Sequence, residues 1–310
     1  MGILNKMFKW FTTKDRNGNE MNLGYVLDGE PKTVAEVEKL FKAFQLEKYF
    51  VSIKPLLRQK IDVSLTPAKE EEFKKASSKI GGQPNLPNGQ VWPKSENGKS
   101  MSFIGQLNFS EVSKYDDSGL LPKNGLALFF YCSDQEAWGF DPKDRSRFKV
   151  VYTPDSNETN KSNFPEDLEV HSIFKPNKIK FISCLSIPTW QEDSINGMIE
   201  DKDSDNYFEV SSGSENQIFG YANCVQGTME LECQLVTNRL YCGDASGYEN
   251  PKRKELEAGA NDWILLLQID SEEEKTGMMW GDCGKIYFWI KKEDLLKKDF
   301  DKTWCILQCH

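Results

Sequence analysis

The sequence predicts an α+β protein that is mainly antiparallel β, with an N-terminal helical segment ahead of a pseudo-duplicated β-rich body. Three observations lead to this prediction. Helical periodicity is confined to the first third of the chain. From residue 79 onward, short apolar runs alternate with turns rich in Gly, Pro and Asn, a pattern typical of strands joined by loops. Several blocks of this second region also recur in the same order.

Residues 1–32 are predicted to be an N-terminal extension. Apolar side chains recur there at helical spacing, at Ile3, Leu4, Met7, Phe8 and Phe11. We expect a short helix packed on the body rather than a membrane-surface helix, because one or two turns bind lipid weakly. Myristoylation of Gly2 is excluded, since its motif requires Ser or Thr where this chain has Lys6. Residues 15–32 are rich in Gly, Asn and Asp and predict a loop.

Residues 33–78 are predicted to form a mainly helical buttress. Thr33 and Glu36 form a capping box, and an apolar stripe follows to about residue 49. Thr66-Pro67 predicts the start of another helix, with three Glu in its first turn. Apolar residues between the two helices, over residues 53–65, predict a strand or an extended packing segment.

The clearest predicted strands all lie in the second region. They are Phe103–Leu107, Gly125–Cys132, Phe148–Tyr152, Ile179–Leu185, Trp263–Ile269, Lys285–Ile290 and Thr303–Gln308. The strands 125–132 and 285–290 are apolar at nearly every position, so we expect each to be covered on both faces.

Three pairs of blocks predict an internal duplication. Lys79–Gln83 is similar to Gln217–Tyr221, Phe103–Asn108 to Leu265–Asp270, and Gly125–Phe130 to Gly284–Trp289. Repeat one is therefore placed at about residues 79–190 and repeat two at about 217–310, within a single domain over residues 33–310. The second repeat contains an insertion with Pro251–Glu257, which we expect to be helical.

Composition excludes two classes of protein. The net charge of −9 argues against a nucleic-acid-binding protein, because such affinity depends on clustered Lys and Arg. Apolar runs such as Trp263–Leu267 are far too short to span a bilayer. The sequence leaves the oligomeric state open.

Cysteine and histidine usage restricts the chemistry further. No secretory signal precedes the eight Cys, so we expect free thiols and a cytoplasmic location. The only histidines are His171 and the terminal His310. Catalytic schemes that use histidine as the base therefore have one internal candidate, which argues against most of them.

Metal and nucleotide motifs are incomplete. Asp201, Asp203 and Asp205 have the spacing at which a calcium loop begins, but Asn206 and Ser212 replace the Gly and Glu that such a loop needs. Cys305, Cys309 and His310 lack a convergent fourth zinc ligand. No Gly-rich phosphate loop follows a strand. The sequence thus predicts no metal site and no cofactor.

Six residues are the candidates for binding a ligand or partner. They lie at matched positions or in the loop after the second matched strand: Trp92, Gln106, Gln268, Asp270, Trp280 and Asp282. Each has a structural alternative. A Gln at a strand end can satisfy backbone groups where the ladder stops, and the Trp rings can be core anchors that close the strand ends. Asp282 can form an Asx-type turn into Gly284.

The matched blocks resemble the YwqG-like family of uncharacterised, mostly bacterial proteins. The resemblance covers roughly residues 35–309 and rests on Ile80-Gly-Gly-Gln-Pro-Asn-Leu-Pro, Trp92-Pro, Phe103-Ile-Gly-Gln-Leu-Asn, Leu121-Pro-Lys-Asn-Gly-Leu-Ala-Leu-Phe-Phe, Trp263-Ile-Leu-Leu-Leu-Gln-Ile-Asp-Ser and Trp280-Gly-Asp-Cys-Gly-Lys-Ile-Tyr-Phe-Trp-Ile. It implies a mostly antiparallel β architecture with flanking helices, built as a pseudo-duplicate. It implies no activity. The second Gly turn departs from the family pattern, because Ala222 follows Tyr221 where Pro is usual.

Two functions remain open. The first is a non-catalytic protein-binding module whose acidic surface attracts a basic protein or a small polar ligand. The second is an enzyme of unrecognised type, a carboxylate-based hydrolase with its cleft between the two repeats. We favour the first. A structure discriminates between them by locating carboxylates with perturbed pKa values.

Overall fold

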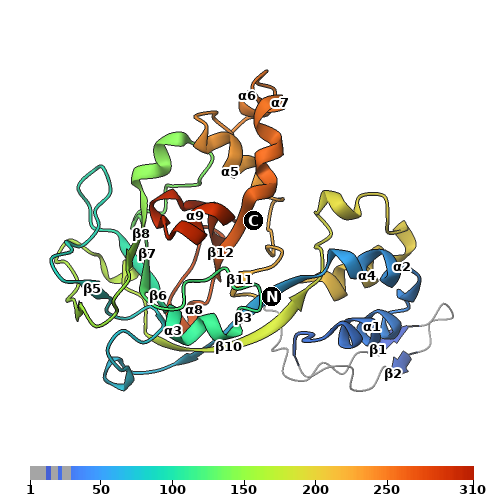
Figure 1. Cartoon of the computed structure of the whole chain (residues 1–310), viewed down its shortest axis with the longest axis horizontal. Coiled ribbons are helices and arrows are strands. Elements are labelled where there is room, and N and C mark those ends of the chain that lie inside the picture. The colour runs from blue at the N-terminus through green and yellow to red at the C-terminus, as the bar shows by residue number, and fades with distance from the viewer. Residues whose placement is uncertain (1–11, 15–19, 23–28) are drawn as a thin grey trace.

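The structure is a computed structural model, and it describes residues 12–14, 20–22 and 29–310 (Figure 1). Within the N-terminal extension, β1 (Thr12–Lys14) pairs antiparallel with β2 (Glu20–Asn22). The loop predicted over residues 15–32 is therefore wrong at β2. Strands of three residues are too short to have a periodicity that a sequence can reveal. The helix predicted over residues 3–11 lies outside the described residues.

Helices from two distant parts of the chain form a helical lobe, which we define as residues 30–57 and 187–212. α1 (Val34–Ala43) begins at the predicted capping box: Glu36 N donates to Thr33 Oγ1, and Thr33 N donates to Glu36 Oε2. The predicted helix is interrupted at Gln45, whose φ is +59°, and α2 (Glu47–Ile53) follows. α4 (Ser204–Ser211) completes the lobe (Figure 1).

The helical lobe has its own hydrophobic core. That core combines side chains from both segments of the lobe: Val37, Phe41, Phe44, Leu46, Tyr49, Phe50, Ile53, Ile187, Ile195, Ile199, Tyr207 and Val210. The region between the predicted repeats thus supplies half of the lobe.

One ten-stranded antiparallel sheet forms the body of the protein. The strand order is β14-β13-β12-β11-β3-β10-β4-β6-β7-β8. The bounds are β3 (Arg58–Pro67), β4 (Lys79–Ile80), β6 (Ser102–Asn108), β7 (Leu126–Tyr131), β8 (Phe148–Thr153), β10 (Asn177–Ser186), β11 (Gln217–Phe219), β12 (Trp263–Asp270), β13 (Lys285–Lys291) and β14 (Trp304–Gln308). All seven strands predicted from the sequence are confirmed. The fold is α+β and mainly antiparallel β, as predicted.

Shorter elements cover the sheet. β5 (Asn85–Pro87) and β9 (Thr159–Lys161) form a separate two-stranded sheet. The helices outside the lobe are α3 (Phe109–Val112), α5 (Glu230–Thr237), α6 (Ala245–Tyr248), α7 (Arg253–Leu256), α8 (Glu273–Thr276) and α9 (Lys292–Lys297). α7 lies in the insertion where a helix was predicted.

The sheet curls until its two ends share one core. The Phe129 ring of β7 lies 5.0 Å from that of Phe288 in β13, and the Phe148 ring of edge strand β8 lies 5.2 Å from that of Trp304 in edge strand β14. Both pairs pack edge to face. The indole N–H of Trp304 donates to the carbonyl of Gly139 at 2.8 Å. The enclosed core therefore contains residues from every part of the sheet.

The two halves of the sheet share local geometry. A register shift lies between Phe103 and Gly105 in β6, and another lies between Leu265 and Leu267 in β12. Each shift ends one residue before a Gln of the matched blocks, Gln106 in β6 and Gln268 in β12. After β4, φ is +68° at Gly81 and +71° at Gly82; in the second half, φ is +62° at Phe219 and +71° at Gly220.

The helix predicted to start at Thr66-Pro67 is wrong, and the buttress is not helical over its whole length. Both residues end β3, and only a 3₁₀ turn, η2 (Glu70–Glu72), follows. The Glu70 carboxylate lies 2.6 Å from the ammonium of Lys79 and accepts from Gln83 N at 3.0 Å. Because Lys79 is 1% exposed, its charge needs this partner, and the local propensity for helix is overridden.

Within the described part of the chain, no helix has the length and apolar character needed to cross a bilayer.

Removal of the Glu70 carboxylate tests its pairing with the buried Lys79. Glu70→Ala leaves the buried Lys79 ammonium without its anion, so we expect the free energy of unfolding to fall by about 3–5 kcal/mol. The neighbouring Glu71 is exposed, so Glu71→Ala is the matched control and should change it by no more than about 0.5 kcal/mol. Urea denaturation measures both variants. Equal effects would contradict the assignment of Glu70 as the partner of Lys79.

Candidate functional site

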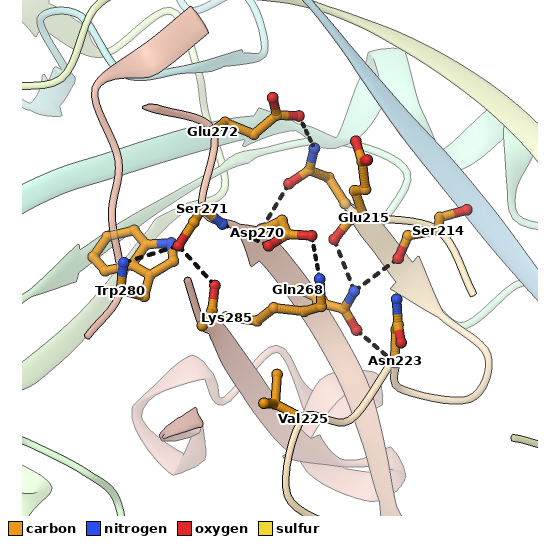
Figure 2. Close-up of polar contacts among 12 residues, drawn as sticks. Ser214, Glu215, Asn223, Val225, Gln268, Asp270, Ser271, Glu272, Trp280 and Lys285 are labelled. Carbon is orange, nitrogen blue, oxygen red and sulfur yellow. Dashed lines mark hydrogen bonds and ion pairs between the residues drawn. The ribbon is translucent and has the colours of Figure 1, made fainter. Parts of the chain in front are cut away.

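Gln268 connects three segments of the second half of the sheet. It lies in β12 opposite Gln217 and is fully buried. Its Oε1 accepts from Asn223 N at 2.9 Å, and its Nε2 donates to the carbonyls of Ser214 at 2.9 Å and Glu215 at 2.8 Å (Figure 2). The amide is used by backbone groups on both sides of the short strand β11, so it closes the ladder there.

Gln106 makes matching contacts in the first half. It lies in β6 opposite Lys79 and is fully buried. Its Oε1 accepts from Asn85 N at 2.9 Å, and its Nε2 donates to the Ser77 carbonyl at 2.7 Å. Both Gln side chains therefore satisfy backbone groups near a strand end, which is the structural alternative to ligand binding. Neither amide is available to a ligand.

Asp270 lies two residues beyond Gln268, at the end of β12. Its carboxylate pairs with Lys285, and both side chains are mostly buried. Burial raises the Asp270 pKa, while the neighbouring ammonium of Lys285 opposes that rise. Glu272 pairs with Lys275 at 2.9 Å and accepts from Asn216 Nδ2 at 3.0 Å. These carboxylates are therefore largely neutralised by their own neighbours.

Trp280 is a core residue. It is 0% exposed, and its ring packs edge to face against Phe174 at 5.5 Å and Tyr131 at 6.0 Å. Its backbone N–H donates to Ser271 Oγ at 3.0 Å, which fixes the loop after β12 (Figure 2). The ring closes one end of the main core, so it cannot be a surface contact for a partner.

Trp92 and Asp282 are not part of this buried group. Trp92 is 8% exposed, donates to the Met101 carbonyl at 2.9 Å and belongs to a second cluster on the outer face of β7. Asp282 follows Trp280 in the same turn but is exposed, and its carbonyl accepts from His310 N at 3.2 Å. The structure thus brings Gln268, Asp270 and Trp280 together, leaves Asp282 at the surface next to Trp280, and places Trp92 and Gln106 elsewhere.

A pocket that the sequence did not predict lies in the helical lobe. It has a volume of about 260 Å³ and is formed by residues 190–199, the loop that follows β10. Trp190 is 44% exposed at its rim, and its ring lies 6.5 Å from that of Tyr207. Glu192 and Asp193 line the same pocket. The signal in the sequence is an aromatic residue followed closely by two acids, at the end of predicted repeat one and just beyond it.

Glu192 faces the body of the protein as well as the pocket. Burial and the nearby carboxylate of Glu230 raise the pKa of Glu192 to about 7, while Arg58 opposes that rise. The Glu230 pKa is also raised, mainly by burial. The Arg58 guanidinium lies 4.0 Å from the ring centroid of Tyr221, which holds it at the junction between lobe and body. An added cation is therefore favourable at Glu192.

The buried thiols are unsuited to nucleophilic catalysis, and His171 lies at the surface. All eight Cys are free, six of them buried, as predicted for Cys132, Cys184 and Cys305. Burial raises the pKa to about 12 for Cys132 and to about 11 for Cys184, so these thiols stay protonated at neutral pH. The His171 side chain is 69% exposed and lies 3.5 Å from Glu169. Among the residues that the structure describes, no group of three or more His, Cys, Asp or Glu is placed to hold a metal ion.

Fold and site together define an α+β protein with one curled antiparallel sheet, a helical lobe and an acidic pocket in that lobe. The family model described as a domain of unknown function (DUF1963) matches residues 78–309, about three quarters of the chain. The chain belongs to this family. A comparison with curated proteins finds no match. The family description assigns no activity.

Substitution of Trp280 distinguishes a core anchor from a surface contact. Trp280→Ala opens a cavity in the main core, so we expect it to lower the free energy of unfolding by about 3–5 kcal/mol. Trp190→Ala is the matched control, since that ring is partly exposed, and it should lower stability by about 1 kcal/mol or less. Urea denaturation measures both. A near-native stability for Trp280→Ala would refute its role in the core.

Thiol reactivity tests the burial of the cysteines. Cys283 is the exposed cysteine, so an aromatic disulfide reagent at pH 8 should label about one thiol per chain rapidly and the others slowly. Cys283→Ser should remove the fast phase. Rapid labelling of several thiols in that variant would show that the strands open far more often than this packing implies.

Proposed function

We propose that the protein is a non-catalytic binding module that recognises a basic protein through the pocket in its helical lobe. The observation that supports this proposal is the combination of Trp190, Glu192 and Asp193 around one cavity. An exposed indole beside two carboxylates suits the side chain of Lys or Arg, because the ring face and the carboxylates both attract a cation.

Charge adds to this preference. The chain has a net charge of −9, which steers basic partners toward it and raises their association rate. Burial, together with repulsion from the nearby Glu230 carboxylate, raises the pKa of Glu192. A bound cation would relieve that repulsion. A basic partner would therefore gain affinity from the pocket itself, in addition to its general attraction to an acidic protein.

The alternative, a carboxylate-based hydrolase, has weaker support. Such enzymes need two carboxyl groups whose pKa values are pushed apart, one staying ionised and the other protonated. The pKa values of Glu192 and Glu230 are both raised. They also lie between lobe and body rather than between the two repeats.

The remaining finer assignments are part of the same proposal. We propose a single domain over residues 33–310, composed of two repeats at about 79–190 and 217–310. The matching contacts of Gln106 and Gln268, together with the equivalent register shifts, support a duplication. A kinship with the YwqG-like proteins and a cytoplasmic location also remain proposals.

A titration with a synthetic peptide rich in Lys and Arg tests the proposed function. Ionised Glu192 is required, and its pKa is about 7. The ionised fraction rises as the pH increases from 6 to 8, so we expect binding to be about tenfold tighter at pH 8 than at pH 6. Glu192→Gln should remove most of this pH dependence and weaken binding at pH 8. Isothermal titration calorimetry measures the affinity.

Glu38→Gln is the matched control for this experiment. Glu38 is exposed on α1 of the same lobe and does not line the pocket, so its loss removes one charge without touching the site. Equal weakening by both variants, or pH-independent binding, would reduce the interaction to general charge attraction and refute the pocket as its site.

A further inference from the structure

A second cavity lies on the body of the protein, between the loop of residues 90–101 and β8. It is an open groove of about 550 Å³. Three buried apolar residues line it: Pro93, Met101 and Phe148. Three cations also line it, Lys94, Arg145 and Lys149. This lining differs in sign from the pocket in the helical lobe, so the two cavities suit different ligands.

Arg145 is the fixed cation of this groove. Its guanidinium lies 5.3 Å from the ring centroid of Phe148, and its Nη2 donates to the backbone carbonyl of Asp301. Because that acceptor is a carbonyl, the guanidinium retains N–H donors for another partner. Burial lowers the pKa of Arg145, while Asp301 and Asp299 oppose this effect. An anion in the groove would compensate the buried charge.

Ser95 adds a hydroxyl to the lining of the groove. The residue is only 6% exposed and lines the groove. Its backbone N–H donates to the Lys99 carbonyl, and its hydroxyl makes no hydrogen bond within the described chain. Because this hydroxyl borders the groove, it can donate to an acceptor that enters there.

The acidic residues near the groove are already engaged. Asp301 pairs with Lys149 at 2.5 Å. Asp167 lies 3.8 Å from Lys94, and its two oxygens accept from the backbone N–H and the hydroxyl of Ser100. Glu96 also lines the groove, where it accepts from Ser146 Oγ at 3.0 Å. Among the described residues, Arg145 is thus the groove cation that bonds no carboxylate side chain, and it lies over the apolar ring of Phe148.

We infer that this groove binds an organic phosphate, a phosphate monoester attached to an apolar group. The phosphate would lie against Arg145, Lys94 and the Ser95 hydroxyl, because a tetrahedral dianion accepts several hydrogen bonds at once. The apolar group would lie on Met101 and Phe148, and the cavity has the volume of an ordinary small-molecule site. This inference does not depend on the proposed function.

Calorimetric titration with phenyl phosphate tests the inference, with inorganic phosphate and benzoate as comparison probes. Phenyl phosphate should bind best, since inorganic phosphate lacks the apolar group and benzoate lacks the tetrahedral dianion. Arg145→Gln should weaken binding of phenyl phosphate about tenfold or more, as loss of a charge-assisted hydrogen bond does. Ser95→Ala should weaken it about threefold to tenfold.

Two controls keep the result interpretable. Lys99 lies in the same loop outside the groove lining, so Lys99→Gln removes a charge nearby and should change the affinity less than about twofold. Lys94→Gln replaces an exposed side chain and tests the groove even if Arg145→Gln destabilises the protein. No binding of phenyl phosphate at millimolar concentration, equal binding of benzoate, or an equal effect of Lys99→Gln would each overturn the inference.

Discussion

The pairing of β3 with β10 is the interaction on which the rest of the structure depends. The two strands pair over ten consecutive residues, from Arg58 opposite Ser186 to Pro67 opposite Asn177. β11 to β14 extend the sheet from β3, and β4, β6, β7 and β8 extend it from β10. At one end the same two strands lead into the helical lobe (Figure 1). A single strand pair thus joins both halves of the sheet and both hydrophobic cores.

Burial governs what the candidate residues do. A Gln in a curled sheet with a closed core must satisfy its amide internally, because water is excluded there. Gln106 and Gln268 do so by bonding backbone groups beside β4 and β11. Trp280 fills the end of the core. These residues stabilise the fold, and groups that remain free to meet a ligand lie instead where lobe, loop and sheet edge leave cavities.

The two cavities differ because different parts of the chain line them. The pocket of the helical lobe takes its acids from one short loop, residues 190–199. The groove on the body takes Lys94 from one loop and Arg145 and Lys149 from the segment that leads into β8. The overall charge of −9 hides this local contrast. Both proposals therefore rest on where charges lie, rather than on how many there are.

The sequence by itself determined seven of the strands, the capping box and the burial of Cys132, Cys184 and Cys305, since each depends on local periodicity or on a short motif. It also indicated the matched blocks around Gln106 and Gln268. The tertiary structure alone decided that Thr66-Pro67 ends a strand, because the buried Lys79 ammonium requires Glu70 about ten residues away. It alone placed Glu192 beside Glu230 and Arg145 over Phe148. Such contacts depend on how the chain returns to itself, and local periodicity contains no information about that path.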